Sequence, residues 1–371
     1  DLYLTDRVQE RPPASARTIG LEGCTLFPGL VNAHDHLELN HYPRSAFRGR
    51  YDNAHQWGED LNARLNAEPY RTLRGYPLAD RLFIGGLKNL LSGATTVAHH
   101  NPPHRALFRR DYPVTVLRRY GWAHSLHFET PDQVRASCRR TPAALPWFIH
   151  LAEGTDSSAA DEYRRLRGLE CAGSNTVLVH GVGLPDTDCV EAAQRVRGLV
   201  WCPTTNLYLL GQTTPARRWV EAGGQLALGS DSRLTASGDL LDELRAACAL
   251  GFSPNEAVSL ATAEAAALIG LPQAGHLRPG APADCVALRT AGGAEALCRA
   301  RRADLALVIH GGVPQIGAPD LMAQFPIPTV AARLDGQPKA IHMRLARQIR
   351  RCSLREPGLE LEPEPSRLFW F

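Results

Sequence analysis

Two histidines one residue apart, His34 and His36, follow the short apolar run 30–33, which a Pro28-Gly29 turn precedes. The run is typical of a buried strand. Alternate residues of a strand point to the same side, so the two imidazoles could bind one metal ion. A His-x-His pair also occurs by chance in many chains. The metal hypothesis therefore depends on whether other strands end in matching groups.

Three later apolar runs end in such groups. His150 follows the run 147–149, His180 follows 176–179, and Asp231 follows 226–230. In a barrel of parallel strands every carboxyl end opens on the same face. We therefore expect one site on that face to contain these side chains, which lie far apart in the sequence: His34, His36, His150, His180 and Asp231.

The elements that must position these groups alternate in type over residues 27–271, as short apolar runs separated by amphipathic helical patterns. Such alternation predicts an α/β fold with a parallel sheet, and the length favours a (β/α)8 TIM barrel. The runs that predict strands number seven: 30–36, 95–100, 122–128, 147–152, 176–181, 199–203 and 226–230. We therefore expect one irregular strand or one abbreviated βα unit, with the gap 128–147 as the candidate.

The two ends of the chain predict a second, smaller unit. Short apolar runs in 1–26 and in 272–330 are expected to pair into a small β-sandwich beside the barrel of residues 27–271. The last segment, 331–371, is basic and then rich in Glu and Pro, so we expect a peripheral tail. That tail is a candidate contact surface, and the sequence leaves open whether the protein forms a homodimer.

A long polar and aromatic segment, 37–76, separates the first strand from its helix and contains His55 and Trp57. An insertion after a barrel strand usually belongs to the active-site face, although a solvated excursion is the alternative.

Composition excludes several kinds of partner. The 371 residues carry a formal net charge of only +3, so no strong field predicts binding to nucleic acid or to an anionic membrane. No apolar stretch has the length of a membrane span or the form of a signal peptide. The 9 cysteines include no Cys-x-x-Cys pair, which indicates reduced thiols and a cytoplasmic location. A small-molecule substrate is the expected partner.

Several motifs of this chain occur together and cover roughly residues 27–288: Pro28-Gly29-Leu30-Val31-Asn32-Ala33-His34-Asp35-His36, His150-Leu151-Ala152-Glu153, His180-Gly181 and Gly229-Ser230-Asp231. The combination resembles the amidohydrolase superfamily. It is most similar to the branch of hydrolytic deaminases and chlorohydrolases that includes methylthioadenosine/S-adenosylhomocysteine deaminases, guanine deaminases and triazine hydrolases. The resemblance implies a (β/α)8 barrel with a small β-sandwich built from both chain ends.

The resemblance also implies residue roles. His34, His36, His150 and Asp231 match the family's metal ligands, Glu153 its proton-shuttling acid/base, and His180 the histidine beside the reacting oxygen. Three neutral imidazoles and one carboxylate leave an open position on a divalent ion, which then activates water. The expected catalytic residues are therefore Glu153, His180 and Asp231.

The lysines bear on the number of metal ions. Members of the superfamily with two metals are similar in having a bridging, carboxylated lysine at a strand end. The chain has only Lys88, inside the helical pattern 78–91, and Lys339, beyond the barrel. Neither is placed to bridge, so we expect one divalent metal per subunit. Zinc fits this donor set, and Fe²⁺ is the alternative.

The sequence therefore predicts a metal-dependent hydrolase that deaminates an aminated heterocycle. Two alternatives stay open: hydrolysis of a cyclic amide C–N bond, as in imidazolonepropionase-like members, and a non-catalytic member of the superfamily. Further candidates for the pocket, each with a structural explanation of equal weight, are Trp57, His99, His100, Asn101, His124, His127, Asn206, Tyr208 and Arg233.

Overall fold

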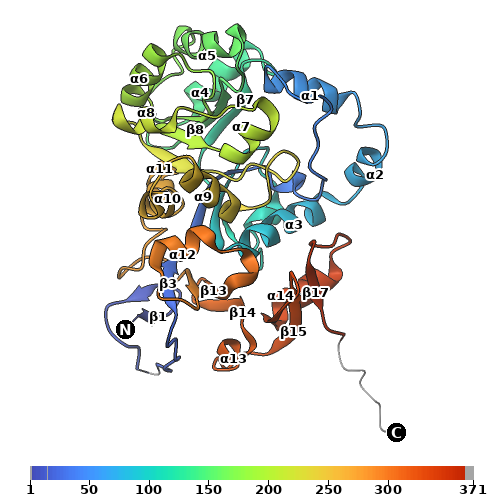
Figure 1. The fold of residues 1–371 in the computed structure, drawn as a ribbon, viewed down its shortest axis with the longest axis vertical. Helices are drawn as coiled ribbons and strands as arrows, with labels where there is room; N and C mark the ends of the chain where they lie inside the picture. Colours follow the sequence, from blue (N-terminus) through green and yellow to red (C-terminus); the bar gives the residue numbers. More distant parts are fainter. Residues whose placement is uncertain (1, 15, 364–371) are drawn as a thin grey trace.

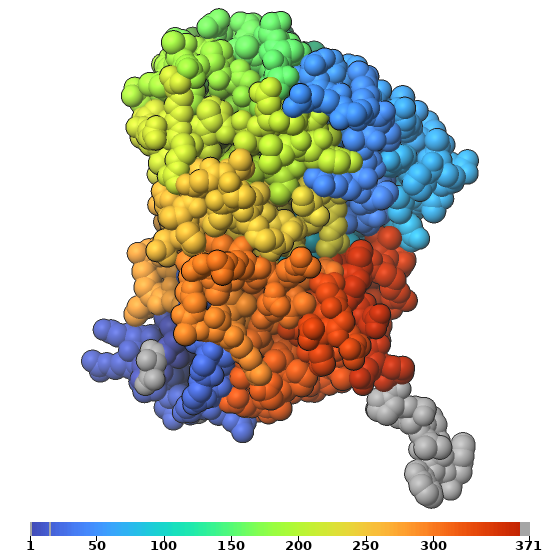
Figure 2. Space-filling model, viewed as in Figure 1, coloured from blue at the N-terminus to red at the C-terminus, as the bar shows by residue number. Residues whose placement is uncertain are grey.

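The computed structural model describes residues 2–14 and 16–363. Parallel strands wrapped by helices form one half of the molecule, and antiparallel sheets form the other (Figure 1). The space-filling view shows the two halves stacked along the long axis, with residues of the chain's last quarter in the lower one (Figure 2).

Eight parallel strands build the first half, in two sheets with the orders β4-β5-β6 and β11-β10-β9-β8-β7. Their bounds are Leu30–Asp35 (β4), Ala94–His99 (β5), Thr115–Val116 (β6), Gly121–Ser125 (β7), Trp147–Leu151 (β8), Thr176–His180 (β9), Gly198–Trp201 (β10) and Leu226–Leu228 (β11). All seven predicted strands are present. One βα unit is abbreviated, as expected, because no helix of the described residues separates β6 from β7. The expected place was wrong, since the gap 128–147 holds an ordinary helix, α4 (Pro131–Arg140). The missing strand is β6, whose two residues are too few to show a period.

The two parallel sheets approach each other where β11 meets β4. The Asp231 N–H donates to the His34 carbonyl at 3.0 Å. A Cβ atom on Gly229 would lie 2.7 Å from the His34 Cβ, so only glycine allows the two backbones to come this close. This contact brings together two predicted ligands that are almost 200 residues apart in sequence.

Helices cover the outside of the parallel strands: α3 (Leu78–Leu91), α4, α5 (Ser157–Gly168), α6 (Asp186–Arg195), α7 (Pro203–Leu210), α8 (Ala216–Glu221), α9 (Leu240–Ala249), α10 (Pro254–Leu260) and α11 (Ala263–Leu268). Except for α7 and α11, which pack in separate clusters, these helices share one apolar core with the strands. Leu87, Leu166 and Leu244 are completely buried in it. Burial of each such leucine contributes about 1.5–3 kcal/mol. This packed layer fixes the strand ends that carry the site.

Two antiparallel sheets form the second half: a small one of β1 (Tyr3–Leu4) and β2 (Val8–Gln9), and a seven-stranded one in the order β17-β15-β16-β14-β13-β12-β3. The strands of the larger sheet are Thr25–Pro28 (β3), Cys285–Leu288 (β12), Leu305–His310 (β13), Val313–Gly317 (β14), Thr329–Leu334 (β15), Gln337–His342 (β16) and Leu359–Leu361 (β17). The N-terminal β3 pairs with β12, so both ends of the chain contribute to this sheet (Figure 1).

The expected tail over 331–371 is wrong for most of that segment. Strands β15 and β16 are joined by Asp335 and Gly336, both in the left-handed region with φ of 47° and 81°. An Asp-Gly pair between two strands is a strong hairpin signal. A basic helix, α14 (Met343–Arg351), and β17 then follow. The end of the predicted tail, 364–371, lies outside the described residues.

The insertion 37–76 contains η1 (Leu37–Leu39), α1 (Ala54–Asn62) and α2 (Tyr70–Arg74). Asn53 forms a β-bridge with Gly154, directly after β8. The insertion therefore lies against the carboxyl ends of the strands, as the sequence predicted.

Candidate metal centre and catalytic pocket

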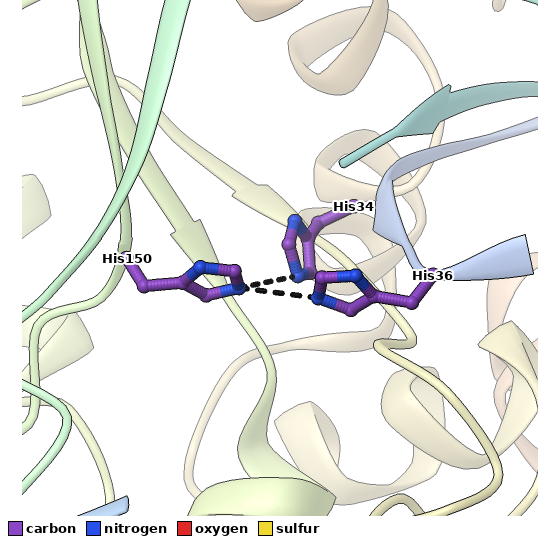
Figure 3. Close-up of side chains that lie close together, drawn as sticks. All are labelled: His34, His36 and His150. Carbon is purple, nitrogen blue, oxygen red and sulfur yellow. Dashed lines mark hydrogen bonds between the residues drawn. The ribbon is translucent and has the colours of Figure 1, made fainter. Parts of the chain in front are cut away.

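Three imidazoles meet at the carboxyl ends of β4 and β8. The Nε2 atom of His150 lies 3.2 Å from Nε2 of His36 and 3.3 Å from Nε2 of His34 (Figure 3). The Oδ1 atom of Asp231 lies 3.8 Å and 3.7 Å from the Nε2 atoms of His34 and His36. All four side chains are buried. The structure thus brings together the four residues that the sequence suggested as metal ligands.

Hydrogen bonds behind the rings fix which nitrogen carries the proton. The His150 Nδ1 donates to the His124 carbonyl at 2.8 Å, so its Nε2 is bare. The His100 Nε2 donates to the Ala123 carbonyl at 2.9 Å, which leaves its Nδ1 to accept a proton from the His34 Nδ1, 3.3 Å away. The Nε2 atom of His34 is therefore bare as well. Burial lowers the pKa of His34 and His150, which keeps both rings neutral.

These residues fit a bound cation. Two bare nitrogens that face each other at 3.3 Å repel unless a positive charge lies between them. Tetrahedral zinc, with Zn–N bonds of about 2.0–2.1 Å, spaces its ligands about 3.3–3.4 Å apart. The hydroxyls of Thr205 and Thr235 donate to the Asp231 Oδ2 at 3.1 and 3.0 Å, which directs Oδ1 toward the imidazoles. The donor set and its spacing match one small divalent ion.

Glu153 and His180 face each other beside this cluster. The Glu153 Oε2 lies 3.5 Å from the His180 Nε2, and the His180 Nδ1 donates to the Asn206 Oδ1 at 2.9 Å. Burial, together with the charge of Asp231, raises the pKa of Glu153 well above its usual value. Burial also lowers the pKa of His180. Because Nδ1 is already committed to Asn206, one proton can be shared between the carboxyl and the His180 Nε2.

Backbone strain is concentrated at these strand ends. Among the described residues, five non-glycine residues have a positive φ, and three of them lie here: Ala152 at 53°, His180 at 74° and Asp231 at 48°. Such conformations cost roughly 1–3 kcal/mol each and persist where the surroundings impose them. Each turns the chain directly at or beside a predicted catalytic group.

A cavity of about 230 Å³ opens beside the cluster. Its wall is largely apolar and aromatic, and it includes Leu39, Trp57, Leu61, Phe128 and Leu209. The predicted groups His36, His150, Glu153, His180 and Asp231 line the same cavity, as do the candidates Trp57, Asn101 and His124.

The other candidates do not line the cavity. The His99 Nε2 faces Glu38 at 3.8 Å, the His127 ring stacks on His55, and Arg233 pairs with Glu356. Tyr208 lies beneath the Arg44 guanidinium. Asn206 accepts a hydrogen bond from His180, and His100 accepts one from His34, so both contact predicted site residues from outside the cavity.

Sequence reasoning assigned no role to two buried side chains that support the site, Lys88 and Glu162. The Lys88 Nζ on α3 donates to Asp35 at 3.0 Å, to Asn40 at 2.9 Å and to Ser230 at 2.9 Å, and two of these partners are chain neighbours of predicted metal ligands. Glu162 on α5 bonds the backbone next to Glu153. A lysine or glutamate on the apolar face of a predicted helix was the available signal, because such residues are rarely buried unless paired. Lys339 lies in the antiparallel sheet, where its Nζ donates to the Leu305 carbonyl.

Comparison with known proteins places the chain in a family. A family model described as "Amidohydrolase family" matches residues 133–315. The 5-methylthioadenosine/S-adenosylhomocysteine deaminase of Haloquadratum walsbyi is 32% identical over 325 residues, which cover 73% of this chain and 72% of that protein. The chain belongs to the amidohydrolase family. The predicted resemblance and enzyme class are thereby confirmed.

One further sequence relative and one solved structure are also similar to this amidohydrolase. The imidazolonepropionase of Deinococcus deserti is 26% identical over 76% of this chain and 82% of its own length. A mutant atrazine chlorohydrolase of Arthrobacter aurescens, solved with zinc and atraton, superposes with a TM-score of 0.68 at 18% identity, over 84% of this chain and 89% of its own. At that identity the likeness shows a shared fold.

Two smaller predictions can be compared with the structure. Each of the nine cysteines is a free thiol, as the absence of paired spacings indicated. None of the helices in the described part of the amidohydrolase combines the length and the apolar character that a bilayer crossing requires.

Proposed function

We propose that this amidohydrolase is a hydrolytic deaminase of an aminated heterocycle and uses one metal ion, preferably zinc, held by His34, His36, His150 and Asp231. The observation that carries the proposal is the convergence of three buried Nε2 atoms and one carboxylate beside the Glu153–His180 pair. The names of the curated relatives, and the zinc in a structural neighbour, support this choice.

We also propose that the two parallel sheets form one closed (β/α)8 barrel, with a small β-domain from residues 1–26 and the segment after 271. The hydrogen bond from Asp231 to His34, which joins β11 to β4, supports this proposal. In a closed barrel all eight strands open their carboxyl ends on one face, which explains why the ligands meet.

The ion, when bound, supplies Lewis-acid activation of water at neutral pH. Glu153 accepts a proton from the attacking water and delivers it to the amino nitrogen that leaves. The His180 Nε2, 3.5 Å from the carboxyl, takes and returns a proton on the same path and carries a positive charge while it holds it. Asn206 keeps the ring oriented through Nδ1.

The cavity wall determines the shape of the substrate. The aromatic side chains of Trp57 and Phe128 line the cavity together with leucine side chains. The Trp57 indole N–H donates to the Ser45 carbonyl at 2.9 Å, so the ring is held in one orientation. A planar heterocycle with an apolar substituent matches such a wall.

The test is ammonia release from a panel of aminated purines, pyrimidines and triazines by zinc-loaded protein. We expect turnover of at least one member, roughly one zinc per chain, and a loss of about 100-fold or more in kcat for Glu153→Gln with zinc retained. The alternative, hydrolysis of a cyclic amide, predicts ring opening without ammonia. Stoichiometric zinc with neither activity would contradict both proposals.

A further inference from the structure

We propose that Glu162 is a positioning residue that aims Glu153 into the pocket by holding the backbone of Ala152. The inference rests on the acid/base role proposed for Glu153. Glu162 belongs to the middle of α5 and is almost completely buried, at 1% exposure. None of the roles assigned above uses its carboxylate.

The central contact joins the Glu162 side chain to the turn that follows β8. The Glu162 Oε2 accepts the Ala152 N–H at 2.6 Å. Ala152 has a φ of 53°, a left-handed conformation that alanine rarely adopts, and it lies between the predicted ligand His150 and Glu153. Burial raises the pKa of Glu162 to about 7, and the hydrogen bond from the Ala152 N–H opposes that rise because it stabilises the carboxylate. The bond between a carboxylate and a backbone N–H is strong, so it can hold this unfavourable conformation.

Two backbone bonds complete the restraint around Glu153. The Ala152 carbonyl accepts from the Gly183 N–H at 2.8 Å, and the Glu153 carbonyl accepts from the Ala54 N–H at 2.9 Å. The chain before and after the Glu153 side chain is therefore fixed. Of these three contacts only the one to Glu162 depends on the identity of a side chain.

The surroundings of Glu162 favour a dedicated role over simple packing. Its second oxygen, Oε1, is buried, lies 3.4 Å from the His55 Nε2 and makes no hydrogen bond among the described residues. A buried carboxylate is costly, and an apolar residue would fill the same space at lower cost. The Ala152 N–H is the group that needs an acceptor at this place.

The experiment compares Glu162→Gln, Glu162→Ala and Ala152→Val in the zinc-loaded enzyme. We expect Glu162→Ala to lower kcat about 10- to 100-fold, with KM and zinc content within about threefold of the wild type. Glu162→Gln keeps an acceptor oxygen and should stay within about fivefold. Ala152→Val, which disfavours the left-handed conformation while Glu162 is intact, should reproduce the loss.

Two further measurements separate positioning from general damage. In the Glu153→Gln background, adding Glu162→Ala should lower kcat by less than about twofold, because the effect of Glu162 passes through Glu153. Amide exchange of the peptide that contains Ala152 should accelerate in the Ala variant and not in the Gln variant. Wild-type kcat in Glu162→Ala, a full additional loss in the Glu153→Gln background, or unchanged exchange would each overturn the inference. If Glu153→Gln itself stays active, the proposed function fails, and the exchange measurement still decides whether Glu162 holds Ala152.

Discussion

The Nδ1 atoms of His34 and His100 lie 3.3 Å apart, and this single contact decides which nitrogen of His34 is left bare toward His150. His100 can accept the proton because its own Nε2 is committed to the Ala123 carbonyl. The tautomer of a predicted ligand is thus set by a neighbouring strand. Loss of such a hydrogen-bond partner of a metal ligand commonly lowers metal affinity about 10- to 100-fold.

Replacing His100 by Phe should therefore weaken zinc binding about 10- to 100-fold while the fold is kept. Competition with a chelator of known affinity measures the change. The matched control is His99→Gln, one residue earlier on β5, since His99 faces Glu38 and the Leu37 backbone. Equal zinc affinity in His100→Phe and wild type would show that His34 chooses its tautomer without this contact.

Lys88→Met should destabilise the protein by roughly 3–5 kcal/mol, because it leaves the buried carboxylate of Asp35 without its cation. Urea unfolding of the metal-free protein measures this directly and avoids a contribution from zinc. Lys339→Met serves as the control. Among the described residues its Nζ donates a hydrogen bond to one carbonyl, at Leu305, so the expected cost is about 1–2 kcal/mol.

Glu243 should make stability depend on pH. Burial raises its pKa from 4.5 to about 8, and its side chain accepts hydrogen bonds from Thr204. Between these values the folded protein retains a proton that the unfolded chain has released, so stability falls as the pH rises from about 4.5 to about 8. Glu243→Gln should remove a slope worth roughly 2–4 kcal/mol over that range. Parallel urea titrations of both proteins at several pH values test this; identical slopes would remove Glu243 as the cause.

Gly154→Val should lower kcat about tenfold or more, because a Cβ there would lie 2.7 Å from the Asn53 Nδ2 and 2.9 Å from the Asp52 carbonyl. The insertion would be pushed away from the chain that carries Glu153. Gly168→Ala, at the end of α5, meets no atom within 4 Å and should leave kcat unchanged. Steady-state kinetics of the two variants suffice, and a Gly154→Val enzyme as fast as wild type would contradict the expected role of this contact.

The sequence predicted the parts of the fold that have a strong local signal. Helix α3 spans residues 78–91, as its apolar period indicated, and each of the seven longer strands was found. Strand β6 was missed because two residues carry no period, and its hydrogen bonds come from β5. The hairpin at Asp335 was missed although an Asp-Gly pair announces it, since the basic residues nearby suggested a solvated tail.

The site was predictable as far as residue type determines chemistry. The strand ends alone indicated five converging side chains, because parallel strands must bring those ends together: His34, His36, His150, His180 and Asp231. The choice of metal ligands among them came from the family resemblance. The side chains that support the ligands and Glu153 could not be predicted in this way. Lys88 contacts a group 53 residues away, His100 one 66 residues away, and Glu162 one 10 residues away across a turn and part of a helix. No spacing rule predicts such pairs.

The bridge between Asn53 and Gly154 ties the insertion, which lines the cavity, to the segment that carries Glu153, the proposed proton carrier. Recognition and turnover in this enzyme are therefore mechanically joined. Exchange of residues 37–76 for those of a relative, made to alter which molecule is accepted, would also alter how fast any accepted molecule reacts. A change of substrate specificity in this protein therefore also requires compensating substitutions in the segment that carries Glu153 and Gly154.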